Sequence, residues 1–336
     1  MKVKKEQIIL VVIILALLLY LFLYKRDRLH YQLPEVPEIP VSEISRIEIT
    51  KPDTSIVIKK KGDNWYIGPQ EYLADSSNIK YMLDDISKPV ITAMASESKN
   101  YNRYGLGTDK KISVRAFSGD TLRREMEVGD LTPSNVHTFV KLGKDYRVFH
   151  VKKNLRWEFG KNMDDLRDKM VLSFEEKLVQ EMHITKGSKS ISLIKNKVPI
   201  EKSVEKEEDT EGKEGKDLPK EEKDLPKEEI VWETSDGEKA DKATIDELLN
   251  TLYDLKCTEY MYDDTKKEDL VDPICTVKLK GDKEYYLSIF SKIEVTDHTH
   301  PAISSENDYP FMLTAYLAKK IMDSSDKLLK KDEESK

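Results

Sequence analysis

Two stretches of the chain repeat one pattern of hydrophobic and polar positions. Each begins with a strand-like run around a tryptophan, Trp65 or Trp232, continues to an Ala-Asp pair, and then places apolar residues at helical spacing. The apolar positions are Ile79, Met82, Leu83 and Ile86 in the first stretch, and Ile245, Leu248, Leu249 and Leu252 in the second. Because Asp75 and Asp241 can accept free N–H groups of the first helical turn, we expect both to be N-caps. Each stretch therefore predicts a helix with one apolar face.

Alternating apolar and polar positions predict strands around both helices. The expected hairpins are 44–60 and 112–129 in the first copy, and 179–195 and 275–290 in the second. Each copy then has a strand that carries Asp-Tyr, at 145 and at 308, and an amphipathic helical stretch. Such helices can cover one face of an antiparallel sheet. The pattern therefore predicts an α+β fold of two tandem duplicated units, with helices packed on one face of each sheet.

The second copy contains a charged, low-complexity run at 197–229, which includes KDLPKEE twice. The equivalent place in the first copy is the short turn 61–64, so the run is interpreted as a disordered loop insertion and not as a linker. The predicted organisation is an anchor with basic flanks at 1–28, a Pro-rich stalk at 29–43, a first repeat at 44–170, a second repeat at 171–325 and a polar tail at 326–336.

The N-terminal stretch 8–24 contains no charged residue, and as a helix it would rise about 25 Å. It predicts a single-pass transmembrane helix and not a cleaved signal peptide, because no pair of small residues precedes a cleavage site. Basic residues flank it equally on both sides, so charge does not orient it. Large C-terminal domains translocate regardless of flanking charge, which favours a cytoplasmic N-terminus and an extracytoplasmic bulk at the cell membrane. Pro34, Pro37 and Pro40 recur every third residue, as in an extended polyproline II spacer.

Composition narrows the class of protein. With 336 residues, 38% hydrophobic and 8% aromatic, the chain can form two ordinary cores. Most of the net charge of −7 comes from the run at 197–229, so the folded part is nearly neutral and no nucleic-acid partner is expected. Cys257 and Cys275 could form one disulfide or remain two buried thiols.

A search for chemistry finds no catalytic, cofactor-binding or metal-binding residue to predict, so no cofactor and no enzymatic activity are expected. His298 and His300 could share one face of a strand, but they precede Pro301 and lack further ligands, so we expect a polar surface loop. The sequence has no G-x-S-x-G elbow and no phosphate-binding glycine loop. Adjacent acids such as Asp84 and Asp85 are expected on solvated faces, and Trp65 and Trp232 in the cores.

The order of several short motifs resembles a known family. The motifs are the ISRIEIT hairpin at 44–50, Gly-Asp-Asn-Trp-Tyr at 62–66, the Asp-capped helix, Tyr-Gly-Leu at 104–106, Val-Gly-Asp at 128–130, Val-Phe at 148–149 and Leu-Arg-Asp-Lys at 166–169. In this order they resemble the bacterial domain of unknown function 4340. Thr108-Asp109 stands where the family usually has a proline. The resemblance implies an accessory component of gliding-motility-type ABC transporters, with a permease and an ATPase as partners, and brings no catalytic residue.

The resulting hypothesis is a non-enzymatic, membrane-anchored extracytoplasmic protein, an accessory or scaffold component of an ABC-type transporter or envelope complex. The alternative is a binding module or sensor for a cell-envelope polymer or small ligand in a cleft between the repeats. A metal-dependent envelope hydrolase that uses the loop 297–300 is disfavoured by its ligand count.

Overall fold

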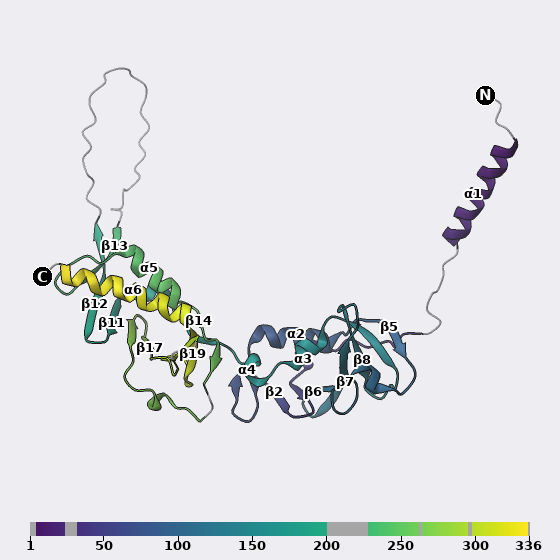
Figure 1. Cartoon of the computed structure of the whole chain (residues 1–336), viewed down its shortest axis with the longest axis horizontal. Helices are drawn as coiled ribbons and strands as arrows, with labels where there is room; N and C mark the ends of the chain where they lie inside the picture. The colour runs from purple at the N-terminus through teal and green to yellow at the C-terminus, as the bar shows by residue number, and fades with distance from the viewer. Residues whose placement is uncertain (1–4, 24–31, 200–227, 262–263, 295–297, 335–336) are drawn as a thin grey trace, which may run out of the picture. The chain divides into compact units, whose positions relative to one another are not determined.

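The computed structural model describes residues 5–23, 32–199, 228–261, 264–294 and 298–334 (Figure 1). It divides into two compact units, Met1–Arg167 and Asp168–Lys336. The described residues form three antiparallel sheets and six α-helices, so the fold is mostly antiparallel sheet.

The first unit contains a nine-stranded sheet in the order β4-β3-β2-β1-β6-β7-β8-β9-β5. Its strands are β1 (Arg46–Thr50), β2 (Ser55–Lys61), β3 (Asn64–Ile67), β4 (Tyr72–Leu73), β5 (Ile91–Ser96), β6 (Ile112–Ser118), β7 (Thr121–Leu131), β8 (His137–Leu142) and β9 (Val148–Lys152). Its helices are α2 (Ser76–Ser87), α3 (Leu155–Gly160), α4 (Met163–Leu166) and the 3-10 turns η1 (Val41–Glu43) and η2 (Tyr101–Tyr104).

The second unit contains an eight-stranded sheet in the order β13-β12-β11-β16-β17-β18-β19-β15, and a small sheet of β10 and β14. Its strands are β10 (Met170–Leu172), β11 (Glu181–Lys186), β12 (Lys189–Pro199), β13 (Glu228–Thr234), β14 (Leu255–Lys256), β15 (Glu259–Tyr260), β16 (Cys275–Lys280), β17 (Glu284–Ile289), β18 (Thr299–Ser304) and β19 (Phe311–Thr314). Its helices are α5 (Lys242–Leu252), α6 (Ala315–Glu334) and the 3-10 turns η3 (Glu176–Leu178) and η4 (Lys267–Asp269).

The two large sheets share one strand order. In each, the early strands β3-β2-β1 or β13-β12-β11 are followed by four consecutive later strands, and a strand that comes after α2 or α5 in the chain, β5 or β15, closes the far edge. The first sheet has one further edge strand, β4. The registers also correspond, because Ile47 lies between Ile58 and Ala116 as Met182 lies between Leu193 and Leu279. Both helices α2 and α5 therefore connect opposite edges of their sheets.

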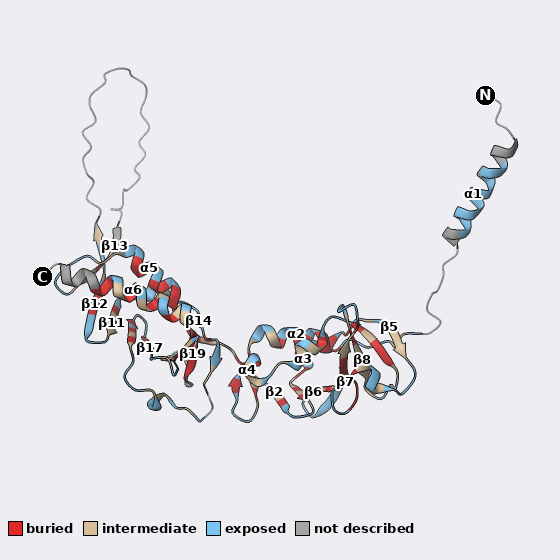
Figure 2. Cartoon of the chain, in the orientation of Figure 1, coloured by how far each residue is buried: buried red, intermediate tan, exposed pale blue. Residues whose placement is uncertain are grey.

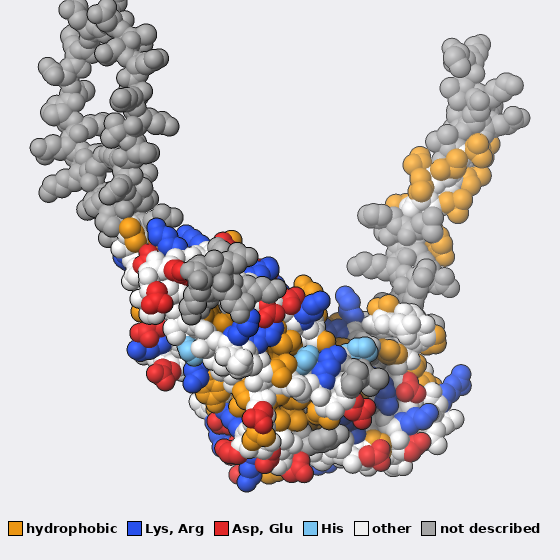
Figure 3. Space-filling view, turned by 60° about the vertical axis from the view of Figure 1, so that its left-hand side comes forward, with side chains coloured by type: hydrophobic (Ala, Val, Ile, Leu, Met, Phe, Trp, Pro, Cys, Tyr) orange, Lys and Arg blue, Asp and Glu red, His pale blue; other side chains and the backbone are white. Residues whose placement is uncertain are grey.

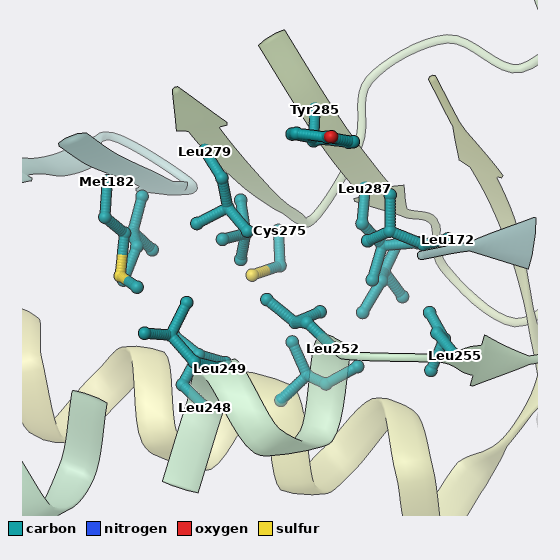
Figure 4. Close-up of a cluster of buried hydrophobic side chains, with 14 of the residues drawn as sticks. Leu172, Met182, Leu248, Leu249, Leu252, Leu255, Cys275, Leu279, Tyr285 and Leu287 are labelled. Atoms are coloured by element: carbon teal, nitrogen blue, oxygen red, sulfur yellow. The ribbon is translucent and has the colours of Figure 1, made fainter. Parts of the chain in front are cut away.

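Helix packing follows the apolar stripes of the sequence. In the second unit, Leu248, Leu249 and Leu252 point from α5 towards Met182, Leu279 and Leu287 of the sheet (Figure 4). The burial of α5 and α6 is confined to the sides that face this cluster (Figure 2). The predicted N-caps are confirmed, since Asp75 accepts from Asn78 N at 2.7 Å and Asp241 accepts from Thr244 N at 3.1 Å.

The predicted N-terminal transmembrane helix requires a correction. The segment forms α1 (Lys5–Leu23), but across the described part of the chain no helix is long and apolar enough to cross a membrane.

The Pro-rich segment predicted as a stalk at 29–43 is bound to the first unit from Pro37 onward. Ile39 is buried, and its N–H donates to Ser87 O at 3.2 Å. Arg124 donates to Pro37 O at 2.7 Å. Pro37 and Ile39 are thus part of the folded body, because backbone groups of both are hydrogen-bonded to it. Residues 29–31 lie outside the described part.

Two boundaries in the second unit differ from the sequence-based expectation. The hairpin of β12 and β13 continues into the charged run as far as the pair Pro199 and Glu228, and the residues between them lie outside the described part. The tail expected from residue 326 belongs to α6 up to Glu334. Leu328 and Leu329 continue the apolar stripe of α6 into the core, and their burial holds the last turns in place.

Candidate functional site

The short helix α3 presents the most unusual side chain of the described chain. Its apolar residues Leu155 and Phe159 are buried, whereas Trp157, on the opposite side, is 70% exposed. Asn154 caps the helix by accepting from Trp157 N at 2.9 Å. The buried hydroxyl of Thr138 accepts from Leu155 N at 3.0 Å and donates to Lys153 O at 2.8 Å. Trp157 is therefore held outward by a well-anchored helix.

A cavity of about 680 Å³ lies beside this helix, within the size range of ordinary ligand pockets. Its charged lining residues are Lys51, Lys110, Arg156, Lys161 and Asp165. They come from the turn after β1, the turn before β6, α3, its C-cap and α4. The lining includes Trp157 and Asn78 as well. Four cations thus face one carboxylate.

Two of the cations, Lys51 and Arg156, are positioned by backbone carbonyls. Lys51 Nζ donates to Gly160 O at 3.1 Å and to Lys161 O at 2.8 Å, where the α3 carbonyls lack helical partners. Burial lowers the pKa of Lys51, and the nearby Asp165 carboxylate partly offsets this effect. Arg156 donates to Lys110 O at 2.9 Å and to Gly129 O at 3.2 Å. The carbonyl contacts fix these cations without neutralising them.

The fourth cation is neutralised within the pocket wall. Lys161 Nζ donates to Glu158 Oε1 at 3.1 Å and to Asn78 Oδ1 at 2.7 Å. Asn78 in turn donates to Asp165 O at 3.0 Å. This chain of contacts ties α3 to α2 and α4, and keeps one wall of the cavity rigid.

The family model described as Domain of unknown function (DUF4340) matches residues 65–273, which is more than half of the chain. The chain belongs to this family. No curated protein and no solved structure matches it. The resemblance drawn from the sequence motifs is confirmed at this level.

The pocket of this DUF4340 member was not predicted from its sequence. Trp157 lies in a stretch whose amphipathic pattern predicted a helix at about 152–159, and a tryptophan on the polar side of that pattern was the available signal. The cations come from positions spread over more than one hundred residues, and only the fold brings them together. The other tryptophans, Trp65 and Trp232, are buried, which confirms their predicted core role.

The two histidines considered as metal ligands lie in different environments. His298 is exposed, whereas His300 lies in β18, is buried, and contacts Phe290 O through Nδ1 at 2.9 Å. The expected surface loop is thus wrong for His300, because β18 includes Pro301 and pairs with β19. Within the described ranges, no group of three or more His, Cys, Asp or Glu residues could hold a metal ion.

The structure decides between the two alternatives for the cysteines, and one of the paired acids differs from expectation. Cys275 is a buried free thiol whose Sγ lies 3.8 Å from Ser325 Oγ, so it forms no disulfide with Cys257. Of the adjacent acids expected on solvated faces, Asp84 is exposed but Asp85 is buried. Its position at the inner face of α2 reflects the ion pair that it makes with Lys153.

A second hollow of about 360 Å³ lies over the second unit, along β11, β12, β16 and β17. There, His183 Nδ1 is 2.7 Å from Ser192 Oγ, and His183 Nε2 is 3.2 Å from Thr185 Oγ1. Ser192 and His183 are direct cross-strand neighbours. The cluster is a polar cross-strand ladder, because its third member is a hydroxyl and not the carboxylate that orients a catalytic histidine.

Proposed function

We propose that this DUF4340 protein is a non-enzymatic accessory or scaffold component of an ABC-type transporter or another bacterial envelope assembly. In this proposal its folded units lie outside the cytoplasm, and α1 holds it at the cell membrane by packing against an apolar surface of the permease. The choice of partner rests on what the resemblance to the family implies.

The observation that carries the proposal is the exposed apolar surface of α1. Its described large side chains are exposed by between 47% (Ile14) and 60% (Ile9), and they cover the helix in Figure 3. Contiguous apolar surface of this kind marks sites that bind proteins or membranes. A helix that is apolar all round is buried in its working environment. A hydrophobic partner would supply that environment.

The test uses the full-length protein with a C-terminal tag, solubilised gently from native membranes. We expect an ABC permease and its ATPase to co-purify in near-stoichiometric amounts. Changing Leu15→Asp together with Leu18→Asp in α1 should abolish recovery of both. The control is Tyr316→Asp, which places the same charge on an exposed aromatic residue of α6 and should retain them. Recovery of the tagged protein without a permease, from wild type and control alike, would overturn the proposal.

A second function, ligand binding, is favoured by the cavity beside Trp157. It lies within the first unit and needs no contribution from the second. A pocket of this size with convergent polar groups and an exposed aromatic ring is typical of binding sites. Saturable binding of any small carbohydrate, abolished by Trp157→Ala, would support this function.

A further inference from the structure

The exposed indole of Trp157 is the starting point for assigning a ligand class. The chain has three tryptophans, and this is the one that burial does not account for. Leu155 and Phe159 already anchor α3 in the core, and Trp157 is not part of that core. An indole that stays in solvent beside a cavity provides a large flat apolar face, against which another flat apolar face can stack. The C–H face of a sugar ring is such a surface.

The charges around the indole add a second requirement. Lys110 is exposed, and its ammonium makes no ion pair within the described part of the chain. Lys51 uses two of its three N–H donors on backbone carbonyls. Arg156 faces Asp130 across 3.8 Å, a long contact between partly exposed groups. These three side chains retain positive charge, and Asp165 is the carboxylate in the lining that opposes them.

From these two features we infer that the pocket binds a sugar ring that carries a carboxylate or phosphate group. The ring lies against Trp157, and the anionic group accepts hydrogen bonds from Lys110 and Arg156. Charge-assisted hydrogen bonds of this type are stronger than neutral ones, and a guanidinium can hold a carboxylate or phosphate with two of them. A neutral sugar would leave the ammonium of Lys110 without a charge partner. The inference rests on the ligand-binding function proposed above and is independent of the transporter association.

A nucleic acid would also offer phosphates and flat rings, but the rest of the molecule argues against it. The chain has a net charge of −7, and single-stranded nucleic acids bind along grooves lined by several aromatic residues. Here one tryptophan and a compact set of cations suit a short ligand or one segment of a polymer.

The binding experiment uses the full-length protein and isothermal titration calorimetry with four probes. These are an oligomer of galacturonic acid, a glycerol-phosphate polymer that carries sugars, glucose 6-phosphate, and the uncharged maltohexaose. Indole fluorescence is followed in parallel, because Trp65 and Trp232 are buried and Trp157 should report the ligand. We expect saturable binding of at least one acidic probe, a change in indole emission, and weaker binding at high salt.

Two variants and two controls test the assignment. Trp157→Ala and Lys110→Glu should each weaken binding of the acidic probe by about tenfold or more. Lys152→Ala and Tyr316→Ala change exposed residues outside the cavity lining and should leave binding unchanged. All four sites are exposed, and thermal unfolding checks that each variant is folded.

The outcomes distinguish failure of the anionic-sugar inference from failure of the ligand-binding function on which it rests. Binding of polymers but not of glucose 6-phosphate identifies an envelope glycan as the source of the anionic sugar, and the reverse identifies a free sugar phosphate. Equal binding of maltohexaose, lost in Trp157→Ala, retains ligand binding but overturns the anionic specificity. Failure of every probe, or binding that neither variant alters, overturns the site itself.

Discussion

The ammonium of Lys153 forms an ion pair with the carboxylate of Asp85, a residue of α2 that is only 7% exposed. Lys153 sits in the turn before α3 with a φ of 98°, a backbone conformation that side-chain-bearing residues rarely adopt. The pair joins α2 to the turn that leads into α3, the helix that carries Trp157. It also provides the charge partner that a buried carboxylate requires.

Lys153→Ala should lower the free energy of unfolding by about 1–3 kcal/mol at neutral pH, because it leaves a buried carboxylate without its partner. Burial raises the pKa of Asp85, and Lys153 partly counteracts this rise. Without the lysine, the pKa of Asp85 should rise further. The native state then holds the proton more tightly than the unfolded state, so the deficit should shrink as pH falls through the folded-state pKa.

Urea unfolding of wild type and Lys153→Ala at neutral and progressively lower pH measures this deficit. Lys152→Ala removes a neighbouring exposed lysine and should change stability by less than about 0.5 kcal/mol. A deficit that grows on acidification would contradict the role given to Asp85.

The two N-caps allow matched mutations in the two units. Asp75→Ala and Asp241→Ala should each lower the free energy of unfolding by about 1 kcal/mol, because each removes the acceptor for an N–H group in the first helical turn. Chemical denaturation monitored by circular dichroism measures both. Asp246→Ala removes the same charge from α5 without removing a cap, and a cost equal to that of Asp241→Ala would argue against capping.

Gly129 in β7 is a position where a side chain has no room. A Cβ there would lie 2.1 Å from the backbone oxygen of Tyr104 in η2. Gly129→Ala should therefore lower the free energy of unfolding by about 1–3 kcal/mol or more, since the backbone at Tyr104 or at Gly129 must move. The comparison is Gly119→Ala in the β6–β7 turn, where nothing lies within 4 Å and the positive φ of 57° alone should cost about 1 kcal/mol. Equal thermal shifts for the two variants would contradict the close approach.

The thiol of Cys275 should be inert in the native protein. It is 1% exposed, and burial raises its pKa, so little thiolate forms and reagents cannot reach it. Cys257 is also buried. We expect an aromatic disulfide reagent to label the native protein slowly and to titrate two thiols per chain in denaturant. Thr121→Cys adds an exposed thiol that should react at once. Rapid labelling of the wild type would show that this core opens readily.

Several features of the protein follow from its sequence alone, because they depend on neighbouring residues. The N-caps Asp75 and Asp241 lie one position before their helices, and their acceptors act within the first turn. The alternation in β1, β2, β11 and β12 identifies which side chains face a core. The burial of Trp65 and Trp232 follows from the same local pattern.

Other features were decided by contacts between distant residues. The register of β18 buries His300. The burial of Leu328 and Leu329 extends α6 beyond the boundary expected from the sequence. Asp85 is buried because Lys153 reaches it from another element. The pocket beside Trp157 combines cations from distant parts of the chain, and two of them, Lys51 and Arg156, are held by backbone carbonyls that any sequence would possess. Local patterns determine which elements form and which side they bury, whereas the positions of charges in a cavity depend on tertiary packing.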